Sequence, residues 1–390
     1  MYSVDYKNDI KKQLIEELSE NVGLDDKEIL SEIDLKIEQY EVADRPLKLI
    51  DKIKLRKSIY DSLKNYDILT ELLEDKSVNE IMINAYDEIF IDKNGKYQRW
   101  DKKFESKEQL DNIIQQIVGK INRIVNVSNP IVDARLYDGS RVHIVLPPIA
   151  IKGATVTIRK FPEKITMKKL IEYGSIDVDV AEFLKKLVRS GYNIFISGGT
   201  GSGKTTFLNA LSEFIPEDDR VITIEDSAEL NISHVKNLVS LETRDKNVEG
   251  EGEISMQMLI RAALRMNPDR IVVGEVRGKE ALDMLQAMNT GHDGSLSTGH
   301  ANSSYDMLSR LETMVLMAEN LPLLAIRQQI ASSIDILIHL VKLKNKKRVV
   351  YEITELTELE GENYTTNRLF EYKEDHLVKC NALKNTRKLD

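Results

Sequence analysis

The sequence predicts an α/β protein, because the hydrophobic pattern changes twice along the chain. Residues 1–65 carry apolar side chains at helical spacing only, whereas residues 66–162 mix strand and helix patterns. Within residues 175–390, short buried strands alternate with helices, which is typical of a sheet with helices on its faces. We therefore expect a helical module, an α+β domain, a linker at 163–174 and an α/β domain.

The composition is that of a protein with more than one hydrophobic core. The chain has 390 residues, of which 42% are hydrophobic and 31% are charged, enough for two or three domains. The net charge of −9 and the pI near 5.5 disfavour nucleic acid as a direct partner. Cys380 is the only cysteine, so an intramolecular disulfide and a cage of several thiolates around zinc are excluded. A reducing cytoplasm fits this composition.

The sequence offers no sign of a membrane anchor. Residues 1–10 lack a basic segment followed by an apolar core, and no stretch approaches the roughly 18 apolar residues of a membrane span. We expect a cytoplasmic protein that reaches a membrane only through its partners.

Residues 1–65 are predicted to form three short amphipathic helices, with breaks near Gly23 and Pro46. Apolar residues recur there every three or four positions, as in Ile10, Leu14 and Leu18. Both a small helical bundle and a docking module fit this pattern.

Residues 66–162 predict an α+β domain. Its helices are expected near residues 68–73 and at 107–125. The signal Lys93-Asn94-Gly95-Lys96 predicts a hairpin turn between two of its strands. The strands of this domain are expected at 78–83, 88–92, 97–100, 131–133, 141–145 and 154–161.

The α/β domain is expected to contain buried strands separated by helices. Apolar runs rich in β-branched residues predict these strands at 193–197, 221–225, 237–241 and 270–274. A later hairpin is expected from strands at 334–343 and 348–356, joined by a lysine-rich and solvated turn.

The most specific motif lies between the strand at 193–197 and the helix expected at 205–214. Its Gly-x-x-x-x-Gly-Lys-Thr spacing is that of a loop that wraps phosphate groups. Gly198, Gly201 and Gly203 can adopt positive φ, so that backbone N–H groups close around phosphate oxygens at the positive end of the helix. Lys204 would neutralise the β- and γ-phosphates, and the Thr205 hydroxyl would hold Mg²⁺. The expected nucleotide-binding residues are Gly198, Thr200, Gly201, Ser202, Gly203, Lys204, Thr205 and Thr206.

Carboxylates follow two of the predicted strands, where strand ends would face a bound nucleotide. Glu225 and Asp226 end the strand at 221–225, and Glu275 follows Gly274. Glu275 suits Mg²⁺ or its water ligands. Glu225 suits orienting and deprotonating an attacking water, because phosphoryl transfer depends mainly on positioning and charge neutralisation.

Two histidines, His292 and His300, lie in a segment rich in glycine and hydroxyl residues that predicts a loop. A metal site is one interpretation, but no third ligand is evident nearby and the spacing matches no familiar zinc pattern. A γ-phosphate sensor is the interpretation that we favour, because the hydrogen-bonding role of His300 can change with what occupies the site.

These motifs, taken together, resemble those of the secretion ATPases. Thr223–Leu230 resembles the aspartate box, Ile271–Arg277 the Walker B strand and Thr290–His300 the histidine box of that superfamily. The runs Asn129–Val142 and Thr157–Phe161 resemble its CpaF-like branch.

The resemblance implies a RecA-like ATPase core behind a smaller PAS-like domain. It also implies ATP and Mg²⁺ as ligands, a hexameric ring, and a platform protein in the inner membrane, beside which the protein would lie on the cytoplasmic side. The expected function is ATP hydrolysis coupled to assembly of a Tad/Flp or type IV-like pilus or to type II-like secretion. A traffic ATPase of conjugation or type IV secretion is the alternative.

The resemblance also gives three arginines ahead of the linker a catalytic role. By motif position, Arg135, Arg141 and Arg159 are the residues that would reach the nucleotide within the ring, and Arg244 is a weaker fourth. Surface salt bridges are the competing explanation. Two other classes of function stay open, a nucleic-acid translocase and a nucleotide-regulated scaffold without turnover.

Overall fold

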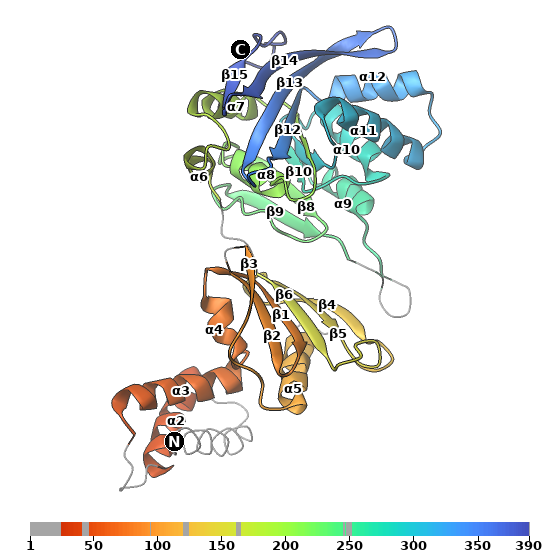
Figure 1. Cartoon of the computed structure of the whole chain (residues 1–390). Coiled ribbons are helices and arrows are strands. Elements are labelled where there is room, and N and C mark those ends of the chain that lie inside the picture. The colour runs from red at the N-terminus through yellow and green to blue at the C-terminus, as the bar shows by residue number, and fades with distance from the viewer. Residues whose placement is uncertain are drawn as a thin grey trace. The chain divides into compact units, whose positions relative to one another are not determined.

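The computed structural model describes residues 25–40, 47–93, 95–119, 125–160, 165–244, 246 and 252–389. Contacts divide the chain into two compact units, residues 1–163 and 164–390, and each is described by itself (Figure 1). The first of the three predicted N-terminal helices lies outside the described residues. The predicted domain boundaries at residues 65 and 174 stay predictions.

Three helices begin the described part of the first unit: α2 (Asp26–Tyr40), α3 (Leu49–Lys64) and α4 (Leu69–Glu74). Isoleucines recur every fourth residue of α2, so they lie on one face of the helix. The buried cluster that they form with α3 contains Ile29, Ile33, Ile37, Leu55 and Ile59.

An antiparallel sheet of six strands forms the rest of this unit, in the order β3-β2-β1-β6-β5-β4. The strands are β1 (Val78–Ala85), β2 (Glu88–Lys93), β3 (Lys96–Arg99), β4 (Ile131–Arg135), β5 (Arg141–Val145) and β6 (Thr155–Arg159). The helix α5 (Lys107–Gly119) buries its apolar stripe in one core with alternate residues of these strands. Because side chains alternate between the faces of a strand, the opposite face carries polar residues such as His143 and Arg159.

A sheet of nine strands is the centre of the second unit, in the order β15-β14-β13-β12-β7-β11-β10-β8-β9. The strands from β12 to β9 are parallel, and β13, β14 and β15 are antiparallel additions. Their bounds are β7 (Ile194–Gly198), β8 (Arg220–Glu225), β9 (Asn237–Glu242), β10 (Arg270–Val273), β11 (Leu296–Gly299), β12 (Ile336–Lys342), β13 (Arg348–Glu360), β14 (Asn363–Lys373) and β15 (His376–Lys379).

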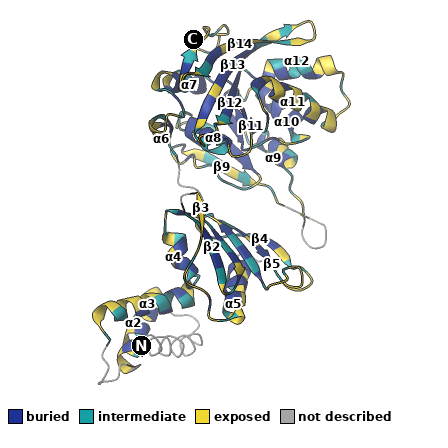
Figure 2. Cartoon of the chain, viewed as in Figure 1, coloured by how far each residue is buried: buried dark blue, intermediate teal, exposed yellow. Residues whose placement is uncertain are grey.

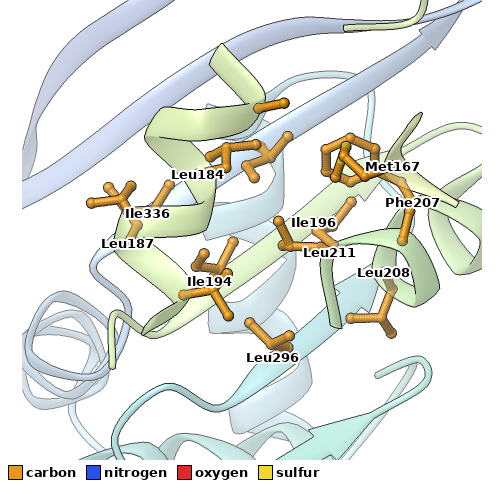
Figure 3. Packing of buried hydrophobic residues seen from close by; sticks show 14 of the residues in the cluster. Met167, Leu184, Leu187, Ile194, Ile196, Phe207, Leu208, Leu211, Leu296 and Ile336 are labelled. Atoms are coloured by element: carbon orange, nitrogen blue, oxygen red, sulfur yellow. The ribbon is translucent and has the colours of Figure 1, made fainter. Parts of the chain in front are cut away.

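Helices cover both faces of this sheet. Their bounds are α6 (Met167–Glu172), α7 (Val178–Arg189), α8 (Lys204–Ser212), α9 (Met256–Ala263), α10 (Glu280–Asn289), α11 (Ser304–Ala318) and α12 (Leu323–Ser333). One apolar cluster joins α6, α7 and α8 to Ile194, Ile196 and Leu296 (Figure 3). A second cluster joins α9 to α12 with Phe195 and other strand residues. Strand residues next to one another therefore bury side chains on opposite faces, and Figure 2 draws β11 and β12 largely as buried.

The prediction of a loop between Thr290 and His300 is wrong for the second half of this segment. Leu296–Gly299 forms the buried strand β11, between β7 and β10. Serine and glycine are not typical strand residues, but the space beside Gly299 does not admit a side chain. A Cβ on Gly299 would lie 2.9 Å from Met307 and 3.0 Å from Phe195. Packing in the tertiary structure thus overrides the local preference.

The strands β14 and β15 extend the sheet beyond the predicted late hairpin. Gly361, with a φ of 64°, lies in the turn between β13 and β14, a conformation that favours glycine. Cys380 follows β15, is exposed, and donates its backbone N–H to the Leu369 oxygen at 2.8 Å.

None of the helices that the structure describes is both long enough and apolar enough to cross a membrane.

Candidate functional site

The phosphate-binding loop lies where the sequence predicts it, between β7 and α8. Gly201 and Gly203 have φ angles of 71° and 95°, in the left-handed region that glycine tolerates. Gly198 does not have a positive φ, so the predicted reason for glycine at this position is wrong. Glycine is needed there for close approach, since a Cβ would lie 2.6 Å from the Leu340 oxygen of β12.

Lys204 begins α8, and its side chain is buried. Its Nζ lies 3.3 Å from Nδ1 and 3.4 Å from Nε2 of His300. Burial lowers the pKa of Lys204, while the charge of Glu275 opposes that shift. Burial and the neighbouring Lys204 lower the pKa of His300 as well, so the imidazole is neutral at pH 7 and can accept a hydrogen bond.

Glu275 lies between His300 and Arg277, an arginine that the sequence prediction did not select. Its Oε1 lies 2.8 Å from Nε2 of His300 and makes no hydrogen bond within the described residues. Its Oε2 accepts from Nη2 of Arg277 at 2.7 Å, and Arg277 Nη1 reaches Asp226 at 3.1 Å. Arg277 was visible only as the last residue of the Walker B-like run.

Glu225 ends β8 and is 3% exposed. Its Oε2 accepts the backbone N–H groups of Glu229 at 2.8 Å and Leu230 at 3.1 Å. Burial raises its pKa to about 7, and these two hydrogen bonds oppose the shift. A carboxyl group of this kind can exchange a proton near neutral pH.

The remaining predicted loop residues lie around Lys204. Thr205 and Thr206 are half-buried in the first turn of α8, and Thr200 is exposed at the loop. A cavity of about 550 Å³ adjoins the loop and is lined by Gly199, Thr200, His300, Ala301, Asn302, Asp306, Ser309 and Arg310. Arg310 of α11, another residue not selected from the sequence, brings positive charge to this cavity.

The residues present fit a magnesium ion held beside a nucleotide. Glu275 Oε1 and Ser202 Oγ are buried oxygens that make no hydrogen bond within the described structure. Carboxylate and hydroxyl oxygens are the ligands that Mg²⁺ takes, directly or through its waters. Among the described residues, His292 is not part of this site, because its Nδ1 lies 2.9 Å from the Pro268 oxygen.

The three arginines predicted as catalytic lie in the first unit, side by side in one row of its sheet. Arg135 pairs with Arg141 across β4 and β5, and Arg141 pairs with Arg159 across β5 and β6. Paired residues share a face, and neighbouring strands lie about 4.8 Å apart, so the three arginines form one row, in which Glu80 of β1 lies opposite Arg159. Arg244 differs, since its Nε donates to the Gly252 oxygen at 2.8 Å within its own loop.

The second unit thus gathers a lysine, two carboxylates, a neutral histidine and a glycine loop at the carboxyl ends of parallel strands. This edge of an open parallel sheet is where such folds bind ligands. A lysine and backbone N–H groups neutralise phosphate charge, and a carboxylate with a pKa near 7 can accept a proton from water. The arrangement can support hydrolysis of a nucleoside triphosphate.

Comparisons with known proteins place the chain among relatives of similar sequence. Conjugal transfer protein TrbB of Rhizobium radiobacter is 31% identical over 330 residues, which cover 83% of this chain and 97% of that protein. Type IV secretion system protein PtlH of Bordetella pertussis is 32% identical over 291 residues, which cover 68% of this chain and 86% of that protein.

The solved structure of the pilus retraction motor PilT with bound ADP has a TM-score of 0.55 at 21% identity, and the match covers 82% of this chain and 84% of that one. This likeness confirms the predicted fold class, an α/β protein with a RecA-like core. The model of the family described as Type II/IV secretion system protein matches residues 62–389. The chain therefore belongs to the family of type II/IV secretion system proteins.

Proposed function

We propose that this protein hydrolyses ATP and couples the reaction to mechanical work in a conjugal transfer or type IV secretion system. The observation that carries the proposal is the contact chain from Lys204 through His300 to Glu275, beside a glycine loop with left-handed Gly201 and Gly203. ATP is the substrate that such a loop binds in this family.

Each side chain has a separate task in the proposed reaction. Lys204 leaves His300 and neutralises oxygens of the β- and γ-phosphates. Glu275 and Thr205 would hold Mg²⁺, which would supply positive charge against the phosphate oxygens. Glu225 orients the attacking water and takes its proton, and His300, freed from Lys204, responds to the γ-phosphate.

The arginine row is proposed to complete the site in a homo-hexameric ring. An arginine that meets developing phosphate charge contributes roughly 10³- to 10⁵-fold in rate, so a row in a different unit would make turnover depend on assembly. Partners in this proposal are five copies of the chain and an inner-membrane platform protein, with the ring on the cytoplasmic side.

The type of machine that we propose is supported by the relatives and not by the site. The sequence motifs favour assembly of a Tad/Flp pilus. TrbB and PtlH, which match this chain over most of their own length, are named for conjugal transfer and type IV secretion. We therefore place the alternative interpretation of the sequence ahead of pilus assembly.

The test is the ATPase rate as a function of protein concentration, with the mass of the particle measured in parallel. We expect turnover to rise as hexamers form, Lys204→Ala to lose nucleotide affinity, and Arg141→Ala to keep affinity but lose about 10³-fold in turnover. Arg99→Ala, on the exposed strand β3 of the same sheet, is the control for lost surface charge.

Three results would count against the proposal. Unchanged affinity in Lys204→Ala removes the phosphate-loop assignment, and full turnover of a monomer removes the ring. Strong stimulation by single-stranded DNA or RNA would favour a nucleic-acid translocase instead.

A further inference from the structure

The turn between β12 and β13 reaches the phosphate-binding loop. Arg348, the first residue of β13, donates its Nε to the carbonyl oxygen of Gly201 at 2.9 Å. The Cδ atom of Arg348 also lies 3.3 Å from the place that a Cβ on Gly203 would take. No motif of the sequence pointed to this contact, because the two residues lie 147 positions apart.

This hydrogen bond fixes the orientation of one peptide group of the loop. A trans peptide is planar, so the Gly201 carbonyl and the Ser202 N–H point in opposite directions. The Ser202 N–H donates to the Gly199 oxygen at 3.2 Å, inside the loop. Because Arg348 holds the Gly201 carbonyl toward itself, the Ser202 N–H points the opposite way, toward the Gly199 side of the loop.

The peptide needs such a restraint because Gly201 is conformationally free. With a φ of 71°, Gly201 lies in a region that glycine enters and leaves at little cost. A rotated peptide would direct the carbonyl oxygen, a partial negative charge, toward bound phosphate.

The hairpin that carries Arg348 is itself fixed against the strand that leads into the loop. The strands β12 and β7 pair in parallel, with Leu340 opposite Gly198. Ser197 Oγ also lies 2.9 Å from Nδ1 of His339, within the buried part of the pair. Arg348 is thus held in register with the loop by the sheet.

We propose that Arg348 is a positioning residue of the phosphate-binding loop, which holds the Ser202 N–H toward the phosphates of a bound nucleotide through its bond to Gly201. This inference rests on the proposed nucleotide site. It assigns Arg348 an effect on affinity for phosphate groups without contact between Arg348 and the nucleotide.

Two substitutions separate the hydrogen bond from the charge. Arg348→Gln places the donor Nε2 at the position of the arginine Nε and removes the charge. Arg348→Lys keeps the charge and places a methylene group there. Arg348→Ala removes both, and Lys344→Gln, on an exposed lysine of the same turn, is the control.

The measurement is the dissociation constant of ADP for the full chain, with adenosine, which lacks phosphates, as the second ligand. We expect Arg348→Lys and Arg348→Ala to bind ADP roughly tenfold more weakly and Arg348→Gln to remain near the unsubstituted protein. Adenosine binding should not change. The inference is overturned if Arg348→Gln does not bind ADP more tightly than Arg348→Lys.

Hydrogen exchange of the Ser202 amide without nucleotide gives a second readout. Exchange should be faster in Arg348→Lys than in Arg348→Gln, and equal rates overturn the inference. Lys204→Ala tests the nucleotide site separately, since unchanged ADP affinity in that variant contradicts the proposed function whatever Arg348 does.

Discussion

Glu225 shows at the scale of one residue how two local effects compete. Its carboxylate accepts two backbone N–H groups, which favour the charged form, yet it is almost completely removed from water. Burial has the larger effect, so the pKa rises to about 7. The group is suited to accept a proton from water at neutral pH, and it makes the stability of the fold depend on pH.

The sign of that dependence can be tested. The pKa of Glu225 is about 7 in the folded state and near the ordinary 4.5 in the unfolded chain, so the folded state binds the proton more tightly. The contribution of Glu225 to the free energy of unfolding is largest below pH 4.5. It falls by roughly 3 kcal/mol in all as the pH rises toward 7. Relative to the unsubstituted protein, Glu225→Gln should therefore gain stability between pH 5 and pH 8.

Urea unfolding at the two pH values measures this difference. Glu217→Gln, at an exposed carboxylate paired with Lys236, is the matched control and should show almost none of it. An equal effect of Glu225→Gln at both pH values would contradict the raised pKa.

Much of the site could be predicted at this scale, since Lys204, Glu275 and His300 meet as the motifs indicate. Arg277 and Arg348 could not be chosen. An arginine shows its role only when the fold brings its partner close, and the Gly201 carbonyl that Arg348 contacts has no signature in the sequence.

At the scale of elements, the pair of strands β7 and β12 determines where the phosphate-binding loop begins. Gly198 lies opposite Leu340 in this pair, and a Cβ there would lie 2.5 Å from Ser202 Oγ and 2.6 Å from the Leu340 oxygen. Backbone atoms cannot move aside as a flexible side chain can, so the two strands would have to separate.

Gly198→Ala should therefore destabilise the second unit by about 1–3 kcal/mol, the usual cost of overpacking. Gly199→Ala is the control, because a Cβ on Gly199 would meet nothing within 4 Å. Thermal unfolding of both variants checks this, and equal melting temperatures would show that β12 does not restrict β7 at Gly198.

Strands with apolar, β-branched sequences were predictable, whereas β11 was not. Its residues Leu296–Gly299 are mostly small, and it becomes a strand because β7 and β10 bind it from both sides. Pairing of that kind depends on residues distant in the sequence.

At the scale of the whole molecule, each unit has its own hydrophobic core. The two apolar clusters of the second unit lie entirely after residue 164. The third and fourth clusters belong to the first unit. Because the described residues of the two units share no apolar cluster, we expect the second unit to fold without the first.

A fragment of residues 165–390 tests this expectation and the arginine row together. It should bind ADP as tightly as the full chain but hydrolyse ATP about 10³-fold more slowly, since the row is absent. The full chain with Arg135, Arg141 and Arg159 changed to alanine is the control and should show the same loss. A fragment with the full rate would place all catalytic charge in the second unit.

The two units divide at residues 163 and 164, beside the start of the linker that the sequence predicts at 163–174. The number of strands in the larger sheet could not be predicted from the sequence. The strands β14 and β15 are recognised only by the pairing of β14 with β13 and with β15.

Cys380 has a practical consequence for following this protein at work. A chain with one exposed thiol accepts one maleimide dye at one known place, next to β15. A second thiol introduced as Tyr137→Cys, where the side chain is 86% exposed near the arginine row, would carry the matching acceptor. Fluorescence energy transfer between the two dyes would then test, in single particles and in real time, whether the distance between the two labelled positions changes during turnover.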